Sequence, residues 1–78
     1  MKKKRRIGVT FFNPLINKFD INFLNSESHG GLQHGDILFL RNEETWKWEK
    51  VEVEFDEIWF FIGKNTVSCI KENMAVEI

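Results

Sequence analysis

The apolar residues of this chain fall in short runs that turn-forming residues separate, and no run has the spacing of an amphipathic helix. Phe19, Ile21 and Phe23 alternate with polar residues, which is the period expected of a strand with one face in the core. Asn13-Pro14 and Gly35-Asp36 are turn signals that bound such runs. The pattern therefore predicts an all-β fold.

We expect six or seven strands, in the ranges 7–12, 19–23, 37–40, 46–55, 58–62, 66–70 and 75–78, with a turn at 42–44. Short strands joined by tight turns are typical of a small SH3-like barrel or a strongly bent antiparallel sheet. The two tryptophans Trp46 and Trp48 occupy even positions, whereas Val51 and Val53 occupy odd ones. A bulge near residues 49–50 would reconcile the two sets.

Seventy-eight residues leave room for one domain, and eight Phe and three Trp supply large apolar area for its core. We divide the chain into a basic N-terminal arm, residues 1–6, and a single β domain, residues 7–78. The lone cysteine, Cys69, cannot form an internal disulfide, and its apolar strand predicts a buried, unreactive thiol. With no membrane-length apolar run and no signal-peptide pattern, we predict a cytoplasmic protein that does not enter the membrane.

The charges are unevenly distributed along the chain. The arm carries five of the eleven basic residues, at Lys2, Lys3, Lys4, Arg5 and Arg6. Residues 7–78 then hold six basic against twelve acidic side chains, a net charge of −6. The arm could attract an anionic partner that the acidic body would repel.

No group of residues has the pattern of a catalytic or cofactor site. His29, His34 and Asp36 provide three candidate metal ligands, and no fourth completes a structural tetrahedral site. The two serines of the same loop, Ser26 and Ser28, lack the surroundings of a nucleophile, and the glycines match no phosphate-binding motif. We therefore predict a protein that is not an enzyme and that binds no metal and no cofactor.

The second half of the chain resembles a small family of bacterial and phage domains of unknown function. The residues that carry the resemblance are Gly35-Asp36, Trp48, Val51-Glu52-Val53-Glu54, Trp59-Phe60-Phe61-Ile62-Gly63 and Ala75-Val76-Glu77-Ile78. The likeness covers residues 35–78. It implies a short protein of phages and mobile elements in Gram-positive bacteria, and it transfers no catalytic residue.

We predict a protein-interaction module of phage or mobile-element origin, with an unidentified host or phage protein as partner. One specific form would be an inhibitor of a host defence or nucleic-acid enzyme. The residues predicted to bind the partner are Trp46, Trp48, Trp59 and Phe61. The alternative is a nucleic-acid-binding protein, in which residues 2–6 contact phosphates and the tryptophans stack on bases.

We also predict a homodimer. Several strands place large apolar groups on both faces, for example residues 37–40 and 58–62. One face of each would be exposed in a monomer, and the polar, glycine-bearing loop 25–34 is expected to cover little of it. A second copy would cover that surface most economically.

Overall fold

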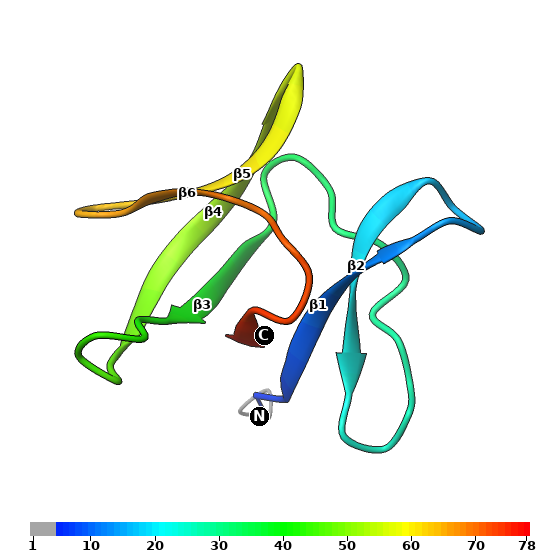
Figure 1. Cartoon of the computed structure of the whole chain (residues 1–78), viewed down its shortest axis with the longest axis horizontal. Helices are drawn as coiled ribbons and strands as arrows, with labels where there is room; N and C mark the ends of the chain where they lie inside the picture. Colours follow the sequence, from blue (N-terminus) through cyan, green and yellow to red (C-terminus); the bar gives the residue numbers. More distant parts are fainter. Residues whose placement is uncertain (1–4) are drawn as a thin grey trace, which may run out of the picture.

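The computed structural model describes residues 5–78, and the regular secondary structure in this range is β throughout. The strands form one antiparallel sheet with the order β2-β1-β7-β3-β4-β5-β6 (Figure 1). Their bounds are β1 (Ile7–Asn13), β2 (Lys18–Phe23), β3 (Ile37–Arg41), β4 (Trp48–Asp56), β5 (Ile58–Gly63), β6 (Val67–Cys69) and β7 (Ala75–Glu77). The predicted all-β class is confirmed. Within residues 5–78, no helix is long and apolar enough to cross a membrane.

The sheet is open, so the predicted barrel is wrong, and the sheet is not strongly curled either. Its two edge strands are β2 and β6, and no pairing joins them within the described residues. Closure would need the free edge of β2, but the segment that follows β2 already occupies that edge. The Leu32 N–H donates to the Phe19 carbonyl at 2.8 Å, and the His29 N–H donates to the Ile21 carbonyl at 2.9 Å.

The short strand β7 joins two parts of the sheet that are otherwise separate. It pairs with β1 on one side, where Val76 lies opposite Gly8, and with β3 on the other, where Val76 lies opposite Leu40. In Figure 1 the β1–β2 hairpin lies on one side of β7, and β3 to β6 lie on the other. The sheet is therefore continuous only through β7.

The core consists of side chains from one face of the sheet together with two residues from connecting segments. Cross-strand pairs supply most of it, such as Leu38 with Val51 and Val53 with Phe61. Its buried members are Ile21, Phe23, Leu32, Leu38, Leu40, Val51, Val53, Phe61, Ile70 and Val76. Burial of each large aliphatic or aromatic side chain contributes about 1.5–3 kcal/mol, so this cluster dominates the stability of the fold.

The predicted bulge in β4 is absent. Residues 48–56 pair in continuous register with β3 and β5, and Val51 and Val53 face the core. Trp46 lies in the turn before β4 instead of in the strand. Trp48, three residues before Val51, therefore points to the face opposite the core, as strand alternation requires. A regular strand therefore accommodates Trp48 together with Val51 and Val53, and no bulge is needed.

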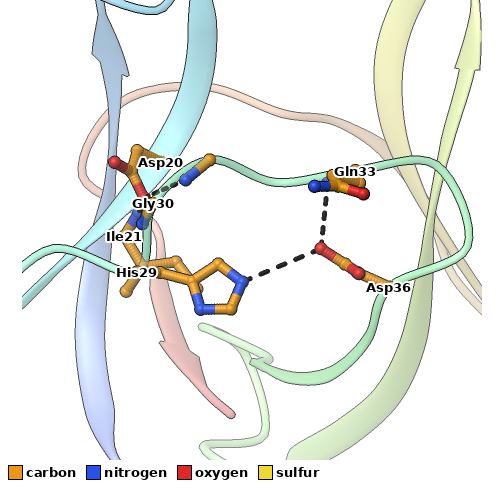
Figure 2. A network of polar contacts seen from close by, with 7 residues as sticks. Asp20, Ile21, His29, Gly30, Gln33 and Asp36 are labelled. Carbon is orange, nitrogen blue, oxygen red and sulfur yellow. Dashed lines mark hydrogen bonds and ion pairs between the residues drawn. The ribbon is translucent and has the colours of Figure 1, made fainter.

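The loop between β2 and β3, residues 24–36, covers more apolar surface than its composition suggests. Its residue Leu32 is completely buried in the core. The outward-facing apolar side chains that the loop was expected to leave uncovered, such as Ile37 and Val67, are exposed. Gly30 and Gly31 have φ angles of 104° and 106°, which glycine adopts without strain. With this backbone conformation, the N–H groups of both glycines point to the side chain of Asp20 (Figure 2).

Asp20 is a fully buried carboxylate that holds the loop in place. Its Oδ1 accepts hydrogen bonds from the N–H groups of Gly30 and Gly31, both at 2.9 Å, and of Ile21 at 2.8 Å. The Asn13 amide donates to Oδ2 at 3.3 Å. Burial alone would raise the pKa of Asp20, but these hydrogen bonds stabilise the charged form and hold the pKa below its ordinary value.

The loop continues from this anchor to β3 through a second set of polar contacts. The Gln33 N–H donates to Asp36 Oδ2 at 2.9 Å, and His29 Nε2 lies 3.8 Å from the same oxygen (Figure 2). The two carboxylates therefore fix the loop in its middle, through Asp20, and at its β3 end, through Asp36.

We predict that Asp20→Asn lowers the free energy of unfolding by about 1–3 kcal/mol at neutral pH, because charge-assisted hydrogen bonds to buried N–H groups weaken. The pKa of Asp20 in the folded state lies below its unfolded value of 3.8. The charged carboxylate therefore stabilises the fold at pH values above 3.8, and this contribution disappears as the pH falls through the folded-state pKa. The difference between wild type and variant should therefore shrink in acid. Urea denaturation over a pH series measures it.

The control for this prediction is Glu57→Gln, which removes an exposed carboxylate in the turn between β4 and β5. It should leave the unfolding free energy within about 0.5 kcal/mol of wild type. An Asp20→Asn protein as stable as wild type at neutral pH would show that the loop does not depend on this carboxylate.

Candidate functional site

A groove of about 770 Å³ opens between the β3–β4 turn, β6 and the segment that connects β6 to β7. We call it the Trp46 groove. The β3–β4 turn, residues 42–47, forms one side, and residues 71–75 form the other. Its lining includes Arg41, Trp46, Glu49, Thr66, Lys71 and Met74.

The turn that carries Trp46 is built around Asn42. The Asn42 side-chain oxygen accepts from the N–H groups of Glu44, at 2.8 Å, and Thr45, at 3.2 Å. Its carbonyl accepts from the Trp46 N–H at 2.7 Å, and its own N–H donates to the Lys47 carbonyl at 2.8 Å. Asparagine suits this position because its short side chain bonds to the backbone that follows it. These contacts fix the turn and the direction of Trp46.

Trp46 has an unfavourable backbone conformation and an exposed side chain. Its φ angle is 60°, in the left-handed region that favours glycine or asparagine, and 65% of the residue is exposed. A bulky residue there costs about 1–2 kcal/mol, and an exposed indole returns little of that through burial. The turn therefore presents a large aromatic group at the rim of the groove at a cost to stability.

Arg41 packs against the tryptophans at the start of the turn. Its guanidinium carbon lies 5.0 Å from the centre of the Trp46 ring and 5.5 Å from that of Trp48. Such cation–π contacts stabilise by about 0.5–1 kcal/mol at exposed sites. Arg41 Nε is buried and has no hydrogen-bond partner within residues 5–78. The guanidinium is thus held mainly by aromatic surfaces, which leaves its outer donors free of carboxylates.

Thr10, in β1, fixes the opposite wall of the groove. Its buried hydroxyl donates to the Lys71 carbonyl and accepts from the Met74 N–H at 2.9 Å. Its backbone carbonyl accepts from the Asn73 N–H at 2.8 Å. At the floor, the Thr66 hydroxyl donates to Glu49 Oε1 at 2.7 Å. Side-chain hydrogen bonds therefore hold both walls of the groove.

Acidic residues outnumber basic ones around the groove. Its four carboxylates are Glu43, Glu44, Glu49 and Glu72, and its two cations are Arg41 and Lys71. Three of the carboxylates, at positions 43, 44 and 72, are exposed. A positively charged ligand would gain from this excess, and a phosphate would be repelled.

The structure separates the four residues predicted to bind a partner. Trp46 lies at the groove rim and is accessible. Trp48 is half-buried beside Arg41, and Trp59 packs against the core, with its ring 4.8 Å from that of Phe55. Phe61 is completely buried, so it offers no surface to a partner in this structure. Its run is apolar on both faces, and the sequence alone did not indicate which face is the core.

The basic arm is partly attached to the sheet. Arg5 contacts Glu77 at 3.1 Å and stacks over Phe39, and Arg6 contacts Glu27 at 3.1 Å and stacks over Phe23. Arg6 also exchanges backbone hydrogen bonds with Ile78. Two of the five predicted nucleic-acid contacts are therefore engaged within the chain. Lys2, Lys3 and Lys4 lie outside the described residues.

The two histidines make different contacts, and the environment of the cysteine differs from the predicted one. His34 Nδ1 accepts from the Phe55 N–H at 3.1 Å, whereas His29 lies beside Asp36. Among residues 5–78, no group of three His, Cys, Asp or Glu side chains could hold a metal ion. Cys69 is exposed, which contradicts its predicted burial. Its strand, β6, is an edge strand, and Cys69 faces away from the core.

Sequence reasoning located the β3–β4 turn but missed the roles of Asn42, Arg41 and Thr10. An asparagine that precedes a turn of charged residues indicates the role of Asn42. The contacts of Thr10 join residues more than sixty positions apart, so no local pattern indicates them.

No protein-family model and no curated protein matches this chain, so the family resemblance of residues 35–78 stays a prediction. The fold is similar to the crystal structure of a structural-genomics protein from the Gram-positive bacterium Ruminococcus gnavus, with a TM-score of 0.76. The match covers 94% of this chain and 100% of the other, at 23% sequence identity. At this identity the likeness shows that the two proteins share a fold.

We predict that Trp46→Gly leaves the free energy of unfolding within about 1 kcal/mol of wild type. Relief of the left-handed backbone, about 1 kcal/mol, offsets the lost contact with Arg41. Trp46→Val, which keeps an L side chain and adds β-branching, should be less stable than Trp46→Gly by about 1–2 kcal/mol. Chemical denaturation of the pair provides the measurement. Equal stability of the two variants would contradict the assigned backbone conformation.

Proposed function

We propose that this chain is a non-catalytic protein-interaction module that binds a positively charged segment of a partner protein in the Trp46 groove. The observation that carries the proposal is the exposed Trp46, held at a φ of 60° by the turn around Asn42. A residue that is costly for the fold and accessible to solvent is explained by a role in binding. Tryptophan is also a residue type in which binding energy concentrates.

The charge of the groove supports a cationic ligand. A Lys or Arg side chain of the partner would lie near the Trp46 indole and the exposed carboxylates of Glu43 and Glu44. Aromatic rings and carboxylates both favour such a cation, by cation–π attraction and by charge pairing. The groove is also large enough for several side chains of a peptide, since ligand sites usually span about 300–1,000 Å³.

Two observations weigh against the nucleic-acid alternative. The accessible tryptophan lies among carboxylates, which repel a phosphate backbone. Arg5 and Arg6 are paired with Glu77 and Glu27, so binding to phosphates would compete with these contacts. We therefore favour a protein partner. In keeping with the resemblance of residues 35–78, we propose a host or phage protein, for which inhibition of a nucleic-acid enzyme is one form the interaction would take.

The test is selection of ligands from a random peptide display library on the purified protein. We expect the selected peptides to be enriched in Lys and Arg. Trp46→Gly should weaken their binding by about tenfold or more, the loss of a typical hot-spot contact. Fluorescence anisotropy of labelled peptides measures the affinities. Because Trp46→Gly is predicted to keep its stability, weaker binding reports the contact and not unfolding.

Two controls make the outcome specific. Leu24→Ala removes a side chain that is 91% exposed and lies outside the groove, and it should bind the selected peptides as wild type does. The double variant Glu43→Gln/Glu44→Gln should weaken binding and reduce its salt dependence. Selection of acidic peptides, or binding that survives Trp46→Gly, would refute the proposal.

A further inference from the structure

A second surface of the molecule is more apolar than an exposed sheet face needs to be. Side chains of β3 to β6 that point away from the core form what we call the outer face. Its apolar members are Ile37, Phe39, Trp48, Ile58, Phe60, Ile62 and Val67. Val67 is 74% exposed, and Ile37 and Ile58 are each about half exposed. Contiguous apolar patches of this kind mark interaction sites.

The register shows that Ile62 and Val67 are direct neighbours and that Glu52 lies between Ile62 and Ile37. Ile37 lies opposite Glu52, Glu52 opposite Ile62, and Ile62 opposite Val67, so one row crosses four strands. In the next row Phe60 lies between Glu54 and Cys69. Neighbouring strands are about 4.8 Å apart, and the row therefore extends for about 15 Å across the sheet.

The charges of the outer face are divided between its two ends. Along β4, Lys50 precedes the apolar row, and Glu52, Glu54 and Asp56 lie in or beyond it. Arg41, opposite Trp48, adds to the positive end. The face is thus positive toward the start of β4 and negative toward its end.

We propose that the outer face is the interface between two copies of this chain. A two-fold axis that lies between two facing sheets and runs across their strands reverses the strand direction from one copy to the other. Placed between the rows of Lys50 and Glu52, such an axis sets Lys50 of each copy opposite Glu52 of the other. Ile37 of one copy then faces Phe39 of the other, beside the Arg5 guanidinium that stacks on the Phe39 ring.

A second copy fits this face better than an unrelated partner because the pattern complements itself. The positive and negative ends exchange places under the two-fold axis, so each charged end meets the opposite charge. The outer face and the Trp46 groove share Arg41, but Trp46 itself takes no part in the pairing.

The first test is the mass of the unmodified full chain in solution. Size-exclusion chromatography with light scattering at micromolar concentration should give twice the mass of one 9.3 kDa chain. Val67→Glu should shift the protein to a single-chain mass, because it buries an unpaired charge in the apolar row of the interface. Leu24→Glu adds the same charge at a site that is 91% exposed and lies away from the face, and it should remain a dimer.

Charge exchange supplies the decisive test. Lys50→Glu and Glu52→Lys should each raise the dissociation constant by about tenfold or more, because like charges then face each other. The double variant Lys50→Glu/Glu52→Lys restores opposite pairs and should dimerise as wild type does. Lys71→Glu, an exposed charge outside the face, is the control. Circular dichroism confirms that each variant is folded.

Two results would overturn the proposal. A single-chain mass for wild type at every accessible concentration would assign the outer face to a different partner. A dimer that persists in both Val67→Glu and Lys50→Glu would place the interface elsewhere on the molecule. Loss of peptide binding by Trp46→Gly, with the dimer retained, would leave both of our proposals standing.

Discussion

The backbone pairing of β7 with two strands that are distant from each other in the sequence is the interaction on which this fold depends. β7 is only three residues long, yet it supplies hydrogen bonds to both β1 and β3. Val76 at its centre is completely buried and lies between Gly8 and Leu40. The hairpin of β1 and β2 alone would be marginal in water, because two strands cannot bury a sufficient apolar face.

Side-chain hydrogen bonds attach the connecting segments, which have little apolar surface of their own, to the sheet. Asp20 binds the N–H groups of the β2–β3 loop, Thr10 binds the β6–β7 connection, and Asn42 binds the β3–β4 turn. Each uses one side chain to satisfy several backbone groups that would otherwise be left without partners. This economy allows a chain of 78 residues to leave one groove and one sheet face available for binding.

The local features of this fold could be predicted from the sequence, and the long-range ones could not. Short apolar or alternating runs bounded by turn residues located all seven strands to within a few residues. The same pattern could not reveal that β7 lies between β1 and β3, or that Leu32 is buried in a polar loop. Phe61 and Trp48 illustrate the limit at the candidate site. Phe61 belongs to a run that is apolar on both faces, which does not show which face is the core. Trp48 was assigned the same orientation as the valines through a bulge that the strand does not have.

The position of β7 also has a kinetic consequence. β3, β4, β5 and β6 follow one another in the chain and pair with their immediate neighbours, so this meander can form through local contacts. β1 pairs locally with β2, but its other edge pairs with β7, which lies more than sixty residues further along the chain. Closing so large a loop is slow, and two strand edges, on β1 and β3, stay unpaired in the meantime. Unpaired edges template association between chains, so the period before β7 docks is the stage of folding most exposed to aggregation.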